Sequence, residues 1–288
     1  MPTTRQHCAT MRRLHQSGCF VIPNPWDIGS ARYLQSLGFQ ALATTSSGAA
    51  WSMGSPDNDI SLGMALAHIH GMVEASDVPV NADFESGFAS DAAGVASNVA
   101  LCLETGVAAL SIEDSRRDPQ RPLYELAEAV ERIAAARAAI DDRGSGALLV
   151  ARAECFLTGH PDPLNEALRR MQAYAQAGAD VLYAPGVKTR EDIALLVREL
   201  APKPLNILSV PAMRLSVAEL AELGVRRISV GGALARAAWG GFMRAAQEIA
   251  QQGSFSALGE AASGAALDKF FTEDLAKRKA PIRRVVRK

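Results

Sequence analysis

Several acidic residues of the sequence stand where apolar runs end. In VNADFESGF (residues 80–88), Asp83 and Glu85 close such a run and lie two positions apart. Side chains at positions i and i+2 of a strand project from the same face, so two carboxylates there would repel one another unless a cation lay between them. Glu113 closes another apolar run, AALSIED, and Asp57 lies in the polar loop WSMGSPDND. The pattern predicts a cation site.

The ligand types indicate which cation would bind. Carboxylates with no histidine or cysteine among them suit a hard divalent ion, Mg²⁺ or Mn²⁺, rather than zinc. The alternative is that each carboxylate caps the following helix or pairs with an arginine. We predict a metal site, and its ligands would be Asp83, Glu85, Asp57 and Glu113.

A guanidinium and three small polar residues follow other apolar runs. Arg152 ends the run ALLVAR, where its charge would be costly without a carboxylate partner. That partner is either an acid of the metal site or the carboxylate of a bound substrate. Ser47 and Gly48 predict an anion-binding nest of backbone N–H groups, or else a plain tight turn. Asn206 closes a later run and would reach the substrate or cap its turn.

A particular fold is needed to bring these residues together. The sequence repeats one unit: a short apolar run, a polar loop, an amphipathic segment and a glycine. The eight runs are FVIPN (20–24), ALATTS (41–46), VPVNAD (78–83), AALSIED (108–114), ALLVAR (147–152), DVLYAP (180–185), PLNILSV (204–210) and RISVGG (227–232). Eight such units in 288 residues predict a (β/α)8 TIM barrel rather than a doubly wound sheet. The carboxyl ends of barrel strands share one rim, where the chemistry takes place.

The segments after the last run predict helices. ALARAAWGGFMRAAQEIAQQG reads as a long eighth helix, and LDKFFTEDLAKR as a further helix with an apolar face. We divide the chain into a barrel domain, residues 1–250, and a C-terminal helical extension with a basic tail, residues 251–288. The tail, KRKAPIRRVVRK, is either a solvated end or a contact for a partner.

Composition limits the partners of this chain. With 30 basic and 31 acidic residues the net charge is −1, so no global field would attract nucleic acid or anionic lipid. The four cysteines form no C-x-x-C pair, which favours a reducing compartment, and no apolar run is long enough for a signal or membrane segment. We expect a cytoplasmic protein that binds a small molecule or another copy of itself.

Four motifs together resemble one family. TTSSGAAWSMGSPD, VNADFESGF, LSIED and VARAE, in this order and spacing, are similar to the isocitrate lyase and phosphoenolpyruvate mutase superfamily, and the resemblance runs from about residue 18 to residue 250. It implies a (β/α)8 barrel that binds Mg²⁺ and stabilises an enolate or oxyanion derived from a 2-oxo acid. It also implies a homo-oligomer, a dimer or a dimer of dimers, in which neighbouring subunits exchange the eighth helix.

The resemblance also implies roles for single residues. Asp83 would be the direct metal ligand, with a water-mediated shell around the ion. Ser47 and Gly48 would hold a substrate carboxylate or oxyanion through their backbone amides, and Arg152 would bind the other carboxylate end. The residues of the water-mediated shell would be Asp57, Glu85 and Glu113.

One segment departs from the family pattern. Lyases of this superfamily carry a K-x-C-G-H type motif on a mobile loop after the fourth strand, and the mutase carries a lysine there. Here the segment is SRRDPQRPLYEL, which has neither cysteine nor lysine. Its arginines, Arg116, Arg117 and Arg121, would close over an anionic substrate or form a self-paired, solvated loop. The departure argues against standard isocitrate or methylisocitrate cleavage.

The leading hypothesis is a Mg²⁺-dependent lyase that breaks a C–C bond in a 2-oxo or 2-hydroxy di- or tricarboxylic acid, either oxaloacetate-decarboxylase-like or methylisocitrate-lyase-like. Arg152, Glu113 and Asp57 would be its catalytic residues. Decarboxylation fits best, because water can protonate the resulting enolate. The alternatives are P–C bond chemistry on a phosphonopyruvate-like compound, and a non-catalytic protein that binds a dicarboxylate such as 2-oxoglutarate.

Overall fold

The computed structural model describes residues 2–116 and 118–279. Arg117 and most of the predicted basic tail, residues 280–288, lie outside the described residues. The chain divides into two compact units, one reaching to Ala235 and the other starting at Arg236. The predicted division at residue 250 stays a prediction.

The first unit is a parallel β-barrel. Its eight strands pair in the order β1-β8-β7-β6-β5-β4-β3-β2, and Ala43 N donates to Pro23 O at 3.1 Å between β2 and the end of β1. The strands are β1 (Phe20–Ile22), β2 (Leu42–Ala43), β3 (Val80–Asp83), β4 (Ala109–Glu113), β5 (Leu148–Arg152), β6 (Val181–Tyr183), β7 (Leu205–Leu208) and β8 (Arg227–Ser229). Each strand falls within one of the eight predicted runs, which confirms the (β/α)8 barrel.

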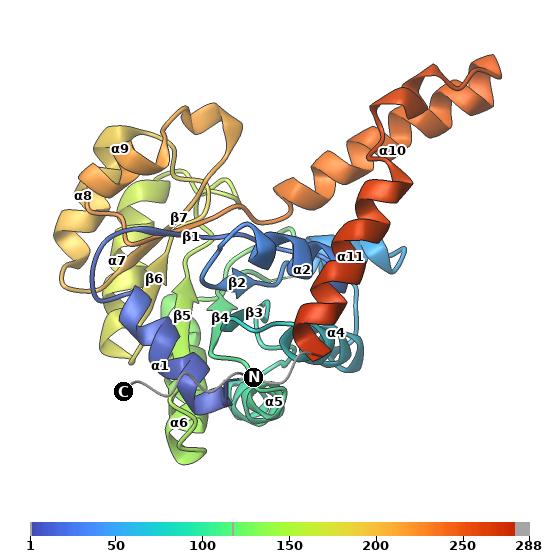
Figure 1. Cartoon of the computed structure of the whole chain (residues 1–288). Coiled ribbons are helices and arrows are strands. Elements are labelled where there is room, and N and C mark those ends of the chain that lie inside the picture. Colours follow the sequence, from blue (N-terminus) through green and yellow to red (C-terminus); the bar gives the residue numbers. More distant parts are fainter. Residues whose placement is uncertain (1, 117, 280–288) are drawn as a thin grey trace. The chain divides into compact units, whose positions relative to one another are not determined.

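Helices of this unit surround the strands (Figure 1). They are α1 (Thr4–Leu14), α2 (Ile28–Ser36), α3 (Ser46–Ser52), α4 (Leu62–Glu74), α5 (Ala92–Glu104), α6 (Leu126–Asp142), α7 (Pro163–Gln176), α8 (Arg190–Leu200) and α9 (Val217–Glu222). Polar side chains cap the start of several of them: the Asp27 side chain, for example, accepts from Ser30 N. At the end of α5, Gly106 has a φ of 89°, which a glycine adopts without strain.

The strands hold their register because most of their side chains are buried. All five residues of β4 and the first four of β5 are buried, and Leu110 and Leu149 have no exposed surface. Full burial of one such aliphatic side chain contributes roughly 1.5–3 kcal/mol. This rigid wall fixes the polar residues that stand at the carboxyl ends of the strands.

β2 ends earlier than its apolar run, and β3 ends before it reaches Glu85. The run ALATTS was expected to continue to Ser46, but β2 stops at Ala43 and α3 begins at Ser46, because the Thr45 side chain caps that helix. β3 ends at Asp83, and Glu85 has a left-handed φ of 47°. The expectation that Asp83 and Glu85 share one strand face is therefore wrong, since the two-residue period holds only within a strand.

The second unit contains the helices predicted after the last strand. The long helix α10 (Ala233–Gln252) begins in the first unit and continues into the second, where η2 (Ser256–Glu260) and α11 (Gly264–Lys279) follow. The Glu248 carboxylate accepts from Ala257 N at 2.6 Å and joins the end of α10 to η2. Among the described residues, no helix combines the length and the apolar character that a membrane span requires.

Candidate active site

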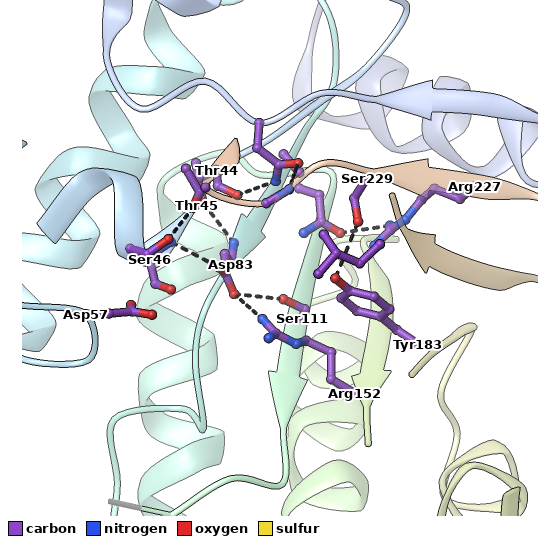
Figure 2. A pocket seen from close by; sticks show the side chains of 17 residues that line it. Thr44, Thr45, Ser46, Asp57, Asp83, Ser111, Arg152, Tyr183, Arg227 and Ser229 are labelled. Carbon is purple, nitrogen blue, oxygen red and sulfur yellow. Dashed lines mark hydrogen bonds and ion pairs between the residues drawn. The ribbon is translucent and has the colours of Figure 1, made fainter. Parts of the chain in front are cut away.

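A cavity of about 160 Å³ opens at the carboxyl ends of the barrel strands. Figure 2 shows acidic and hydroxyl side chains on one side of this cavity and Arg227, Ser229 and Tyr183 on the other. The lining residues are Asn24, Ala43, Thr44, Thr45, Ser46, Ser47, Asp57, Asn81, Asp83, Ser111, Arg152, Tyr183, Leu208, Arg227, Ser229, Gly231 and Gly232. It therefore contains some of the predicted site residues and several that were not predicted.

Asp83 lies at the end of β3 and is held from several sides. Its Oδ1 accepts from Arg152 Nη1 at 2.8 Å, and its Oδ2 accepts from Ser46 N at 3.0 Å. Its own backbone N–H donates to the Thr44 hydroxyl at 2.8 Å. The carboxylate is thus fixed between the first turn of α3 and the guanidinium of β5.

Asp57 faces the same cavity from the loop after α3. Although the residue is exposed overall, withdrawal of its carboxyl group from water and the nearby charge of Asp83 raise its pKa, against the effect of a hydrogen bond with Ser46. A raised pKa means that the ionised form is disfavoured as the site stands. A cation near both carboxylates would reverse that effect.

Arg152 pairs with three carboxylates. Its Nη1 lies 2.8 Å from Asp83 Oδ1 and 3.0 Å from Glu113 Oε2, and its Nη2 lies 2.7 Å from Glu154 Oε1. Burial acts to lower the pKa of Arg152, but Glu113, Glu154 and Asp83 together raise it well above its ordinary value. The sequence left open whether Arg152 pairs with an acid of the protein or with the carboxylate of a substrate. The structure places acids of the protein around this guanidinium.

Glu113 and Glu85 do not line this cavity. Glu113 is buried, accepts a short hydrogen bond from the Ser115 hydroxyl and faces Arg152; burial raises its pKa. Glu85 is also buried and lines two other cavities, one of them shared with Asp83. Within the described ranges, no three or more histidine, cysteine or acidic side chains are grouped closely enough to hold a metal ion. The four carboxylates do not converge as the sequence led us to expect, and metal binding stays a prediction.

Ser47 and Gly48 lie in the first turn of α3 rather than in a loop. Ser47 lines the cavity, and its hydroxyl lies 3.1 Å from that of Thr45. Gly48 is buried, and its N–H donates to the Thr45 hydroxyl at 3.4 Å. A Cβ at Gly48 would lie 2.9 Å from Trp26 Cβ, so close packing explains the glycine. A substrate-binding role for these two residues stays a prediction.

The side of the cavity formed by β7 and β8 carries a group that the sequence analysis missed. Arg227 is buried, and its Nε donates to Asn206 Oδ1 at 2.9 Å. Asn206 itself has no exposed surface and donates to the Ser229 hydroxyl at 3.0 Å, so it lies behind the cavity wall. The sequence does contain an indication of this residue, because Arg227 opens the apolar run RISVGG. A buried guanidinium without a partner is as costly there as at Arg152.

The segment after β4 pairs with itself. Ser115 and Leu123 form a β-bridge, and Arg121 lies 3.5 Å from Asp118. Arg116 Nη1 lies 3.7 Å from Glu128. The described arginines of this segment thus already have acidic partners.

Comparisons with known proteins identify the family. The sequence matches the family described as phosphoenolpyruvate phosphomutase over residues 11–250. The chain belongs to this family, within the isocitrate lyase and phosphoenolpyruvate mutase superfamily. This confirms the resemblance carried by the four motifs.

Individual members show how varied the family is. An uncharacterised protein of Mycobacterium tuberculosis is 34% identical over 75% of this chain and 79% of its own length. Oxaloacetate decarboxylase of Paraburkholderia xenovorans is 30% identical over 80% of this chain and 77% of its own length. The structure of a phosphonopyruvate hydrolase in complex with oxalate and Mg²⁺ is 25% identical, covers 96% of this chain and 98% of its own, and has a TM-score of 0.81. Family membership alone therefore does not fix the reaction.

Proposed function

We propose that this protein is a Mg²⁺-dependent lyase that cleaves a C–C bond in a small 2-oxo or 2-hydroxy carboxylic acid. The observation that carries the proposal is one small cavity that Asp57, Asp83 and Arg152 line together. Opposite charges arranged around a small polar space suit an ion together with a carboxylic acid. The similarity to oxaloacetate decarboxylase favours an oxaloacetate-like acid as the substrate.

The residues around this cavity fit a hard divalent cation. Asp57 and Asp83 supply carboxylate oxygens, and Thr45 and Ser46 add hydroxyl groups, without histidine or cysteine in the cavity lining. Mg²⁺ is commonly held by one or two carboxylates, with water and substrate completing its shell. Asp83 and Asp57 would hold the ion. When bound, it would supply positive charge that stabilises a developing oxyanion.

Arg152 would bind the substrate and stabilise charge. It stays protonated at any working pH, and it lines the cavity. Its guanidinium lies 5.2 Å from the centre of the Tyr183 ring, which limits its movement. A fixed positive charge beside the C1 carboxylate and the C2 oxygen would favour the enolate over the starting acid.

Decarboxylation needs little further machinery from the protein. The bond between C3 and the leaving carboxylate breaks, its electron pair enters the enolate, carbon dioxide departs, and a proton from water adds to C3. Because burial raises the pKa of Tyr183 to about 12, its phenol stays protonated and is available as a hydrogen-bond donor. This sequence of events fits a chain whose segment after β4 has neither the cysteine nor the lysine of its relatives.

A turnover assay tests the proposal. Purified protein would be incubated with oxaloacetate, other 2-oxo and 2-hydroxy acids and phosphonopyruvate, each with Mg²⁺ or with a chelator, and the release of carbon dioxide, 2-oxo acid or phosphate would be followed. Mg²⁺-dependent loss of carbon dioxide that Asp83→Asn abolishes is the expected result. Release of phosphate alone would favour P–C chemistry, and Mg²⁺-dependent binding without turnover would favour a dicarboxylate-binding protein.

A further inference from the structure

Arg227 carries a buried charge that no acidic group among the described residues balances. It opens β8, is 2% exposed and lines the same cavity as Arg152. Its Nε donates to Asn206 Oδ1 at 2.9 Å and its Nη1 to Asn81 Oδ1 at 3.1 Å. Both acceptors are neutral amide oxygens. In the part of the chain that the structure describes, Arg227 forms no ion pair, and its Nη2 has no hydrogen-bond partner.

The guanidinium nevertheless remains charged. Burial, together with the charge of Arg152, lowers the pKa of Arg227 to about 10 against the opposite effect of Tyr183. A pKa of about 10 still leaves the group protonated at neutral pH. A buried charge without a partner is strongly unfavourable, and proteins rarely keep one unless a ligand completes it. The unbalanced charge therefore calls for an anion from outside the chain.

The surroundings hold this charge in a fixed orientation. Asn206 lies on β7 and Asn81 on β3, so hydrogen bonds hold the guanidinium from two sides of the barrel interior. Asn206 is itself oriented by its donation to the Ser229 hydroxyl at 3.0 Å. Two of the five N–H groups of the guanidinium are used in this way, and the planar fork of an arginine suits the oxygen pair of a carboxylate.

We propose that Arg227 binds a second carboxylate of the ligand and so makes the cavity selective for short dicarboxylates over monocarboxylates. The inference rests on the proposed function, in which the oxo-acid end of the ligand lies near Asp57, Asp83 and Arg152. A cavity of about 160 Å³ leaves room for a small acid but not for a long chain. Asn206 and Asn81 then act as positioning residues that orient Arg227.

Matched pairs of acids test this selectivity. Binding to the full-length protein with Mg²⁺ would be measured by calorimetry for 2-oxoglutarate against 2-oxovalerate, which have equal chain lengths but differ in one carboxylate. A charge-assisted pair with Arg227 should make the diacid bind about tenfold to a hundredfold more tightly. Arg227→Gln should reduce that ratio to within about threefold and leave the affinity for the monoacid nearly unchanged.

Two further outcomes separate this inference from the proposed function. If wild-type protein binds neither acid, both proposals fail. If it binds the acids in an Asp83-dependent manner but with no preference for the diacid, or if Arg227→Gln keeps the preference, only the role of Arg227 is overturned. Arg227→Lys serves as a second variant, since it preserves the charge; it should retain part of the preference that Arg227→Gln loses.

Discussion

The two arginines that line the cavity differ in what surrounds them. Arg152, on β5, contacts three carboxylates within 3.0 Å, so that side of the cavity is negative overall. Arg227, on β8, donates to two amide oxygens and forms no ion pair with any described residue, so that side is positive. Carboxylates outnumber guanidinium groups on the acidic side, whereas among the described residues no carboxylate pairs with the guanidinium of the basic side. The difference means that the two sides of the cavity offer a ligand opposite charges, which is what the proposed roles of Arg152 and Arg227 require.

Removing the guanidinium from the acidic side should have the largest effect. Arg152→Met leaves Glu113 and Glu154 buried without their positive partner, and breaking a buried pair in this way costs about 3–5 kcal/mol. Arg227→Met is the matched control. It removes two hydrogen bonds but also an unbalanced charge, so the free energy of unfolding should fall by less than about 2 kcal/mol. Urea unfolding of both variants measures the difference. Equal losses would mean that the two environments are not energetically distinct.

The Arg152 variant should also change how stability depends on pH. Burial raises the pKa of Glu154 to about 8 even beside Arg152, and it raises that of Glu113 as well. Between the ordinary value of 4.5 and the raised value, the folded state binds more protons than the unfolded state, so stability falls as pH rises. Without the positive charge of Arg152, the pKa values of Glu154 and Glu113 should rise further. The difference in the free energy of unfolding between wild type and Arg152→Met should therefore be larger at pH 8 than at pH 5. A difference that does not change with pH would contradict this account.

Asp83→Ala should remove the site for the cation, together with the hydrogen bonds that the carboxylate accepts from Arg152 and Ser46 N. Loss of a direct ligand should weaken Mg²⁺ binding more than the tenfold to hundredfold typical of residues behind the ligands, so a loss beyond about a hundredfold is expected. Titration calorimetry with Mg²⁺ alone measures this without any substrate, and circular dichroism checks the fold. Asp59→Ala, an exposed acid near Asp57, is the control. A variant that binds Mg²⁺ as wild type does would exclude Asp83 as a ligand.

The barrel could be predicted because its signal is repeated. Each strand is short and buried, so it appears as an apolar run, and eight such runs separated by amphipathic segments leave few other folds. Asp83 and Arg152 could be predicted for a related reason. A charge that ends a buried run must stand at the rim, where a partner or a ligand is available.

Other parts of the site depend on local geometry that a pattern does not contain. Glu85 does not line the cavity of Asp57 and Arg152, because β3 ends at Asp83 and the Glu85 backbone is left-handed, with a φ of 47°. Asn206 was predicted to close a strand, but it is the second residue of β7, and neighbouring side chains cover it completely. Arg227 begins a strand instead of ending one, so its position in the sequence does not place it at the rim. Long side chains can reach a cavity from below its rim, which strand position alone does not indicate.

Giving the basic side a carboxylate of its own should remove the difference between the two sides. Asn206→Asp keeps the size of the side chain and puts a carboxylate where Arg227 Nε now donates to an amide oxygen at 2.9 Å. Because a hydrogen bond to a charged acceptor is stronger than one to a neutral acceptor, the free energy of unfolding should rise by about 1–2 kcal/mol. The preference for a diacid should also disappear, since Arg227 would already have an anion. Urea unfolding and the matched-acid titrations measure the two effects, and Arg227→Met/Asn206→Asp, which leaves the new carboxylate without its partner, should lose the gain in stability. A stabilised variant that still prefers the diacid would show that the second carboxylate binds elsewhere.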